Sequence, residues 1–418
     1  MTKRNHKLDS KLKELGDVLN NVKKLDINTI KRHADVFKKL GIQISYPAKI
    51  CFCAIFRNES KNVKRCFDAA KPMIDYLYIS DTGSTDDTIE LIKEWGKENK
   101  IPTTVETEEF KNFGHNRTIS FERAVKAFPQ ADYVLLIDAD MVIKFGTKFN
   151  RNVFKTLSPN GKPIIYYFKQ RNSSIVYDNV RMISTKVKAK CVGVTHEYWD
   201  AGSDCEQMRV PEEILYIDDI GDGGHKQDKF VRDINLLEAG IEAEADNEHL
   251  VGRYYFYLAQ SYKATLQYEK AIETYKKRLD KACPPEEHYY SLYQIGNCYL
   301  ESGKGAKAIE YWNKAWNYRP TRAEALAQIT KYYCLDLSLH HVAVMYGEMG
   351  RRMEMPNDTL FVEYEAHDYK FAYYLSISYF YISEKEKGKK EIEYLRSIKN
   401  KIPMGIMQSI ESNSKFYD

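Results

Sequence analysis

Two groups of acidic residues follow strand-like apolar runs in the first third of the chain. Asp138-Ala139-Asp140 comes directly after residues 133–137, and Asp81 opens a turn after residues 76–80. Apolar runs of this length that end in turn residues indicate buried strands rather than helices. In an open α/β sheet, ligands bind beyond the carboxyl ends of the strands. Carboxylates at two such ends indicate a site for a nucleotide carried with a divalent cation.

The spacing of the second motif has a chemical meaning. Side chains alternate along a strand, so we expect Asp138 and Asp140 to project to the same side while Ala139 points away. Converging carboxylates supply the hard oxygen ligands that Mg²⁺ and Mn²⁺ prefer. A cation held there would neutralise the charge of a departing diphosphate. Asp-x-Asp triplets also arise by chance, so the position after a buried strand is what favours a binding site.

Around these residues, over roughly 48–240, the sequence resembles the family 2 glycosyltransferases of the GT-A fold. Each motif is weak alone, but their order along the chain is specific. The segments that carry the resemblance are ICFCAIFRNE (50–59), DTGS (81–84), FGHNR (113–117), DAD (138–140), GVTHE (193–197) and GDGGHKQDKF (221–230). The resemblance implies an α/β domain of the GT-A type, which is Rossmann-like and binds a nucleotide sugar.

The resemblance also implies roles for single residues. In this family the residue at Asp81 accepts hydrogen bonds from the nucleotide base, Asp138 contacts the ribose and Asp140 binds the metal. Arginines pair bidentately with anionic oxygens, although a surface salt bridge would explain them equally well. The donor-binding residues expected are Phe56, Arg57, Glu59, Asp81, Gly83, Arg117, Asp138, Ala139 and Asp140, and the metal ligands expected are Asp140, Asp138 and His225.

Sugar transfer with inversion needs a carboxylate that takes the proton from the acceptor while the diphosphate departs. Because Glu197 lies in the family's His-Glu motif, the resemblance favours Glu197 as this base, with His196 beside it. An imidazole could also complete the metal shell, and His225, which follows a glycine-rich turn, is favoured for that role over His196. A lone histidine is more often structural. The alternatives to Glu197 are Asp200, Asp218 and Asp219.

From Gly252 onward, strand signals vanish and the chain becomes helical, aromatic and repetitive. Small and aromatic residues recur at a separation of 37 residues, a pattern typical of tetratricopeptide repeats, although their usual period is about 34. Small residues let two helices approach, and aromatic residues fill the next groove. The recurring pairs are Ala259 and Gly296, Tyr262 and Tyr299, Ala271 and Ala308, and Tyr275 and Trp312. A degenerate third copy is expected over 323–349, with a helical cap after it.

The length of 418 residues exceeds the usual size of a single core, and 43% of the residues are hydrophobic. We expect an N-terminal helical extension over residues 1–45, a GT-A domain over 46–240 and a helical tetratricopeptide-like repeat domain over 241–418. The net charge of +4 is small, and the first 40 residues hold eleven basic against five acidic residues. The residues after the first 40 carry no excess of basic side chains, which argues against nucleic acid as a partner.

No apolar run approaches the roughly 18 residues that cross a bilayer, and no secretory signal is evident. The eight cysteines include no CxxC pair, and Cys51 and Cys53 alternate on one face of an expected strand, where packing explains them. A reducing cytoplasmic location is therefore expected. The sequence does not indicate an oligomeric state.

These observations predict a glycosyltransferase that depends on Mn²⁺ or Mg²⁺ and uses a nucleotide diphosphate sugar. The resemblance favours a UDP-sugar and inversion. The acceptor could be a glycan, or a peptide side chain as in the sublancin-type glycosyltransferases, and the repeats would hold it. One alternative is an adaptor that binds partners through its repeats and has an inactive front domain. Another is a nucleotidyltransferase, but residues 56–59 lack the glycine-rich loop and lysine that such an enzyme needs.

Overall fold

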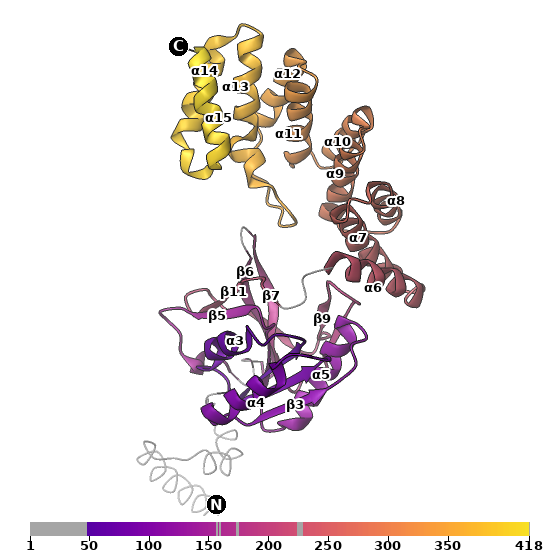
Figure 1. Cartoon of the computed structure of the whole chain (residues 1–418), viewed down its shortest axis with the longest axis vertical. Coiled ribbons are helices and arrows are strands. Elements are labelled where there is room, and N and C mark those ends of the chain that lie inside the picture. The colour runs from indigo at the N-terminus through magenta and orange to yellow at the C-terminus, as the bar shows by residue number, and fades with distance from the viewer. Residues whose placement is uncertain (1–47, 156–157, 159, 173–174, 224–228, 418) are drawn as a thin grey trace, which may run out of the picture. The chain divides into compact units, whose positions relative to one another are not determined.

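The structure is a computed structural model of the whole chain (Figure 1), and it describes residues 48–155, 158, 160–172, 175–223 and 229–417. The helical extension expected over residues 1–45 lies outside these residues. The described residues form two compact units. The first holds residues 48–192 and 197–223, and the second holds residues 193–196 and 229–417.

Four parallel strands form the part of the first unit's sheet that carries the acidic motifs. They lie in the order β3 (Thr103–Thr107), β2 (Tyr76–Asp81), β1 (Ile50–Phe56) and β4 (Tyr133–Leu136). The two strands expected before the acidic motifs are present, each within one residue at its end. Because the strands are parallel, their carboxyl ends meet at one edge of the sheet.

Beyond β4 the sheet continues with strands of mixed direction. β7 runs antiparallel to both β4 and β6, and β11 runs parallel to β6 but antiparallel to β5. β10 adds to β6, while β8 and β9 form a separate antiparallel pair. The bounds are β5 (Met141–Phe145), β6 (Ile164–Asn172), β7 (Ile175–Ser184), β8 (Lys190–Val192), β9 (Tyr198–Asp200), β10 (Glu206–Arg209) and β11 (Leu215–Asp219). The α/β fold class is confirmed.

Helices cover the parallel strands on both faces (Figure 1). Phe52 of β1 packs with side chains of α3 and α4 in one buried cluster, whereas Cys51 and Cys53 pack with Phe121 of α5 in another. This alternation gives β1 apolar side chains on both faces, as a buried central strand requires. The packing role expected for the two cysteines is confirmed. The helices are α3 (Val63–Ala70), α4 (Thr88–Asn99) and α5 (Phe113–Ala127), and a 3₁₀ turn spans Arg151–Val153.

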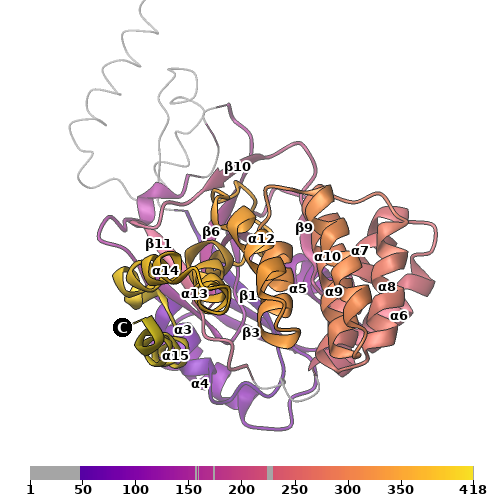
Figure 2. The same cartoon turned by 90° about the horizontal axis from the view of Figure 1, so that it is seen from above.

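The second unit is helical, and each of its helices packs against the next (Figures 1 and 2). Two of them are joined to π-helical turns, Tyr332–Asp336 after α11 and Ala366–Lys370 before α13. The helices are α6 (Lys229–Ala243), α7 (Glu248–Ala264), α8 (Tyr268–Leu279), α9 (Pro285–Glu301), α10 (Gly305–Tyr318), α11 (Glu324–Lys331), α12 (His340–Arg351), α13 (Phe371–Tyr381), α14 (Lys385–Ser397) and α15 (Met404–Ser414), with 3₁₀ turns at Lys399–Lys401 and Lys415–Tyr417.

The repeat expected from the sequence corresponds to pairs of helices. The pair α7–α8 is followed by α9–α10, whose helices begin 37 residues later, and by α11–α12 in the position of the third copy. A Cβ atom on Gly296 would lie only 2.4 Å from Cδ1 of Trp312. The small residue thus lets α9 approach α10, and the fully buried indole fills the groove. The tetratricopeptide-like character of this region is confirmed.

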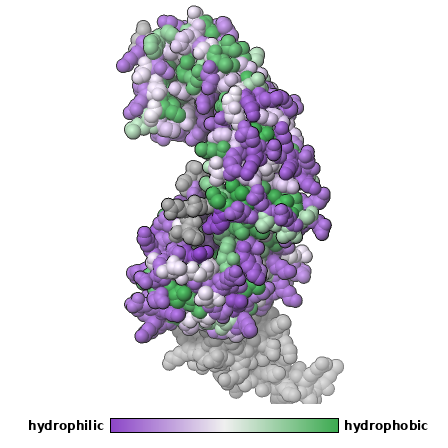
Figure 3. Space-filling view, turned by 45° about the vertical axis from the view of Figure 1, so that its right-hand side comes forward, coloured by the Kyte–Doolittle hydropathy of each residue, from purple (hydrophilic) through white to green (hydrophobic). Residues whose placement is uncertain are grey.

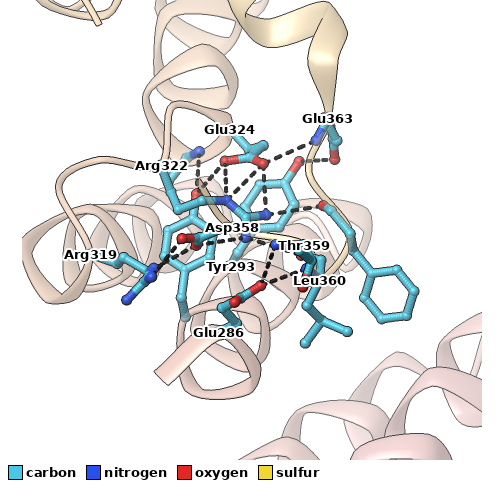
Figure 4. Close-up of polar contacts among 12 residues, drawn as sticks. Glu286, Tyr293, Arg319, Arg322, Glu324, Asp358, Thr359, Leu360 and Glu363 are labelled. Carbon is cyan, nitrogen blue, oxygen red and sulfur yellow. Dashed lines mark hydrogen bonds and ion pairs between the residues drawn. The ribbon is translucent and has the colours of Figure 1, made fainter. Parts of the chain in front are cut away.

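A cluster of buried charged side chains connects the segment between α12 and α13 to the repeats (Figure 4). Arg322 is completely buried, and its guanidinium donates to Glu324, to Asp358 and to the carbonyl groups of Leu360 and Phe361. Every N–H group of this side chain therefore has an acceptor, which buried charge demands. The cluster thus anchors the irregular connection to the repeats.

Among the described residues, no helix is both long and apolar enough to span a lipid bilayer. The face of the molecule in Figure 3 is mainly hydrophilic, with smaller apolar areas between the charged side chains.

Candidate active site

Asp81 ends β2 and is almost completely buried, with 1% of its surface exposed. Its Oδ2 accepts hydrogen bonds from the backbone N–H groups of Gly83 and Ser84, both at 3.0 Å. Gly83 has a φ of +94°, which glycine adopts without strain. Oδ1 of Asp81 is buried and finds no hydrogen-bond donor among the described residues. A buried oxygen in this state is costly, so an N–H group of a ligand would be a suitable partner.

Asp138 follows the end of β4 and lies between two arginines. Its Oδ1 is 2.7 Å from Nη2 of Arg117, and its Oδ2 is 3.6 Å from Nη1 of Arg181. Burial alone would raise the pKa of Asp138, but the two guanidinium groups hold that pKa below its ordinary value. The carboxylate is therefore ionised and oriented at neutral pH, while 23% of its side chain stays exposed to a ligand.

Arg117 connects Asp138 to Glu197. The arginine lies near the start of α5, which is capped by the side chain of Asn112 accepting from the N–H of His115 at 2.8 Å. Its Nε donates to Oε1 of Glu197 at 2.7 Å. One guanidinium thus bridges the residue expected to bind the ribose and the residue expected to act as the base.

Arg181 was not expected from the sequence, although an arginine inside the apolar run Val180-Arg181-Met182-Ile183 is an unusual feature of a buried strand. Its side chain is 9% exposed. Nε and Nη2 donate to Oε1 of Gln170 at 3.2 and 2.6 Å, and Nη1 donates to the carbonyl of Leu136 at 3.3 Å. Nε2 of Gln170 donates in turn to Oδ2 of Asp219 at 3.0 Å. Sequence alone could not pair residues of β6, β7 and β11.

Asp140 lies in a turn and not in a strand. β4 ends at Leu136, and the N–H of Met141 donates to the carbonyl of Asp138 at 3.0 Å. The strand alternation expected to bring Asp138 and Asp140 to one side therefore does not extend to these residues. Their carboxylates make different contacts, since Asp138 faces the arginines and Asp140 faces the loop that follows β11.

The loop after β11 brings Gly223 against two carboxylates. Its N–H donates to Oδ2 of Asp140 at 3.4 Å, and a Cβ atom there would lie 3.1 Å from this oxygen and 3.3 Å from Oε1 of Glu59. The neighbouring Asp222 forms a bidentate ion pair with Arg65 of α3, at 2.6 and 2.7 Å. Glycine at 223 is what allows the backbone to approach Asp140 and Glu59 so closely.

The oxygens of Asp140 and Glu59 are chemically suited to a divalent cation. Within the described part of the chain, however, no three His, Cys, Asp or Glu side chains gather as a metal site. His225, one of the expected metal ligands, lies outside the described residues. The described residues thus offer Asp140 and Glu59 as candidate ligands.

His196 belongs to the second unit, where α7 fixes it. Its ring stacks on Tyr257 with centroids 4.0 Å apart, and its carbonyl accepts from Arg253 at 2.8 and 3.3 Å. Its φ of +50° is strained for a residue with a side chain, so these contacts must compensate. Burial, with the charges of Lys229 and Arg253, lowers the pKa of His196 to about 4, and the ring is neutral at pH 7. These contacts explain His196 by packing, and a catalytic role for it stays a prediction.

The other expected residues at the strand ends have diverse surroundings. The ring of Phe56 is buried against Phe67, at a centroid distance of 5.9 Å, and its carbonyl accepts from the backbone N–H of Thr82. Ala139 is 5% exposed and packs in the same core. Arg57 is exposed at the end of β1. The side chains of Phe56 and Ala139 therefore belong to the core, and only their backbone atoms can contribute to the site. The side chain of Arg57 is exposed to solvent.

The alternatives to Glu197 differ in their partners. Asp219 accepts hydrogen bonds from Gln170 and from Asn172, at 3.0 and 3.1 Å. Asp200 is exposed and accepts the N–H of Gly202 at 3.0 Å. Asp218 is half-buried in β11.

Comparison with known proteins gives matches in both units. Residues 51–181 match the family described as "Glycosyl transferase family 2". The chain is 24% identical over 292 residues to the SPbeta prophage-derived glycosyltransferase SunS of Bacillus subtilis (strain 168), a match that covers 66% of this chain and 64% of SunS. The matched region therefore spans less than two thirds of the length of that protein.

The helical unit has matches of its own. The photosystem I assembly protein Ycf3 of Rippkaea orientalis is 29% identical over 100 residues, which cover 24% of this chain and 54% of Ycf3. The solved structure of the C-terminal part of a TPR repeat-containing protein from Cytophaga hutchinsonii is 20% identical, with a TM-score of 0.33, and the match covers 42% of this chain and 61% of that one.

Proposed function

We propose that this chain, in which a family 2 glycosyltransferase domain is followed by tetratricopeptide-like helical repeats, transfers a sugar from a nucleotide diphosphate sugar to a glycan or protein acceptor. A UDP-sugar is the first candidate for the donor, and inversion is the expected stereochemistry. The observation that carries the proposal is the pair Asp81, at the end of β2, and Asp138, just after β4, because both strands pair with β1. Asp81 has a buried oxygen that meets no donor among the described residues, and Asp138 is ionised and partly exposed.

The chemistry of Asp81 limits the base of the nucleotide. Its buried Oδ1 accepts a hydrogen bond only from a base that presents an N–H group. Uracil and guanine present a ring N–H at the edge that faces such a residue. Cytosine presents an exocyclic amino group beside an unprotonated ring nitrogen, whose lone pair would face the carboxylate. Asp81 therefore favours uridine or guanosine diphosphate sugars over cytidine derivatives. Asp138, which stays ionised, suits the hydroxyl groups of the ribose.

A divalent cation would be held by Asp140, with Glu59 as the nearest additional carboxylate. When bound, the cation supplies the positive charge that a departing diphosphate requires. The role of His225 as a further ligand stays part of the proposal. Gly223 brings its backbone N–H group to the same carboxylate, so a substitution at this glycine would crowd Asp140.

Glu197 is proposed as the base that takes the proton from the acceptor. Its side chain is 17% exposed and is ion-paired to Arg117. This contact, from Nε of Arg117 to Oε1 at 2.7 Å, orients the carboxylate in the site.

The proposal is tested by offering UDP-, GDP- and CDP-sugars to the purified chain with Mn²⁺ and measuring the release of nucleoside diphosphate. Turnover of a uridine or guanosine donor, with the cytidine donor rejected, is the expected result. Failure to bind or hydrolyse any donor would favour the alternative, an adaptor with an inactive front domain.

A further inference from the structure

Arg181 is a buried cation whose position is determined from both sides. On one side lies the carboxylate of Asp138, at 3.6 Å, and on the other lies the uncharged amide of Gln170. Moving a guanidinium out of water costs several kcal/mol unless a counter-charge and hydrogen bonds offset the loss. Gln170 provides hydrogen bonds but no charge, so the charge of Arg181 is compensated mainly by Asp138.

Gln170 can present only its oxygen to Arg181. Its amide nitrogen donates to Oδ2 of Asp219, and this contact determines which end of the amide points each way. The oxygen then accepts from both Nε and Nη2 of the guanidinium. The four side chains form a continuous series in the order Asp219, Gln170, Arg181 and Asp138.

We propose that Arg181 is a positioning residue of the nucleotide site, which holds the Asp138 carboxylate in the orientation that receives the ribose of the donor. Arg117 holds Oδ1 of Asp138 and Arg181 faces Oδ2, so the carboxylate cannot rotate about its bond to Cβ. Gln170 and Asp219 fix Arg181 in turn. This inference rests on the proposed function, because it takes Asp138 as a contact of the donor.

The ribose hydroxyls give a readout that general destabilisation would not move. If the oriented Asp138 carboxylate receives them, a ribonucleotide should bind more tightly than its 2′,3′-dideoxy analogue, and loss of the orientation should reduce that difference. A variant that only destabilises the fold would weaken the binding of both nucleotides alike.

The experiment compares Arg181→Met with Arg151→Met in the full-length chain. Arg151 is ion-paired with Asp75 and bonded to the carbonyl of Ala48, before the amino ends of β1 and β2, so it is a matched arginine away from the strand ends that hold Asp138. Titration calorimetry would measure the affinity for UDP or GDP, and for the 2′,3′-dideoxy analogue, with Mn²⁺ at pH 7, and thermal unfolding would be followed in parallel.

We expect Arg181→Met to weaken binding of the ribonucleotide at pH 7 by roughly tenfold or more, and to reduce its advantage in affinity over the dideoxy analogue. Arg151→Met should lower the melting temperature with neither effect. Asp219→Ala provides a milder variant should Arg181→Met not fold, because it removes the acceptor that orients the amide of Gln170 and should weaken binding several-fold. Wild-type affinity and an unchanged preference for the ribonucleotide in both Arg181→Met and Asp219→Ala would overturn the positioning role alone. Absence of nucleotide binding by the wild-type chain would overturn the proposed function with it.

Discussion

Arg117 donates from Nε to Oε1 of Glu197 at 2.7 Å, and both side chains are 17% exposed. The same guanidinium is ion-paired to Asp138 through Nη2. Two carboxylates proposed for different steps, binding of the donor and removal of the acceptor's proton, therefore share one cation. A ribose hydroxyl that binds Asp138 would change the relative strength of the two ion pairs that Arg117 forms, one with Asp138 and one with Glu197.

The first prediction concerns Glu197. Glu197→Gln keeps an oxygen for Arg117 but cannot accept a proton, so donor affinity should persist while transfer falls by roughly 10²- to 10⁴-fold. The measurement is kcat for transfer beside the Kd for the donor. Asp204→Asn, which changes an exposed carboxylate nearby in the sequence, is the control and should retain the rate. A larger rate defect in Asp218→Asn would place the base there instead.

The second prediction concerns Asp81. In Asp81→Asn the amide oxygen can still accept from Gly83 and Ser84, but the NH₂ group then replaces the buried Oδ1. Two donors would face each other when the base binds, so nucleotide affinity should fall by about 1–3 kcal/mol.

Asp86→Asn is the matched control for this variant. Oδ1 of Asp86 accepts from the N–H of Thr88 at the start of α4, at 3.1 Å, so the change should affect stability rather than affinity. Equal affinity in Asp81→Asn and the wild type would exclude the proposed contact with the base.

Much of this arrangement could be predicted from the sequence because it depends on local patterns. Short apolar runs locate β2 and β4, and the recurrence of small and aromatic residues locates the helix pairs. In the structure one of these small residues, Gly296, lies against one of these aromatic residues, Trp312.

The remainder depends on how distant segments pair. Gln170 and Arg181 come together only because β6 and β7 are neighbours with a particular register, which no local pattern encodes. The different surroundings of Asp138 and Asp140 arise because β4 ends earlier than its apolar run. The contacts of His196 with Arg253 and Tyr257 join segments about 60 residues apart in the sequence.

The third prediction is that the repeats hold the acceptor and take no part in the chemistry. A chain that ends after Ala282 keeps α6, α7 and α8, and should hydrolyse the donor at the full-length rate. Its KM for the acceptor should rise by roughly tenfold, equivalent to about 1.4 kcal/mol. Hydrolysis and transfer are measured side by side. An acceptor KM equal to that of the full chain would contradict the prediction.

The position of the truncation matters because α6 and α7 contact residues 194–196. The hydroxyl of Tyr254 accepts from the N–H of Val194 at 3.2 Å, and Thr195 donates to Asp233 at 3.3 Å. A cut after Ala245 would remove α7 and with it the contacts to Val194 and His196. We therefore expect that shorter chain to be less stable than the chain ending at Ala282, in thermal unfolding.

The fourth prediction concerns the packing of the repeats. In Gly296→Ala the new methyl group would lie 2.4 Å from Cδ1 of the buried Trp312, so the variant should be destabilised by about 1–3 kcal/mol. Gly405→Ala is the matched control, because its Cβ meets no atom within 4 Å and alanine favours the helix by up to about 1 kcal/mol. Urea unfolding of both variants provides the comparison. Equal stability of Gly296→Ala and the wild type would show that α9 and α10 do not approach as described.

The most direct test of the central claim is donor hydrolysis by the wild type and by Asp140→Ala, each with Mn²⁺ and with excess chelator. We expect the wild type to release nucleoside diphosphate only with the cation, and Asp140→Ala to release none while its thermal unfolding stays close to that of the wild type. Full activity of Asp140→Ala, or undiminished wild-type activity in chelator, would contradict a cation-dependent glycosyltransferase with Asp140 as its metal ligand.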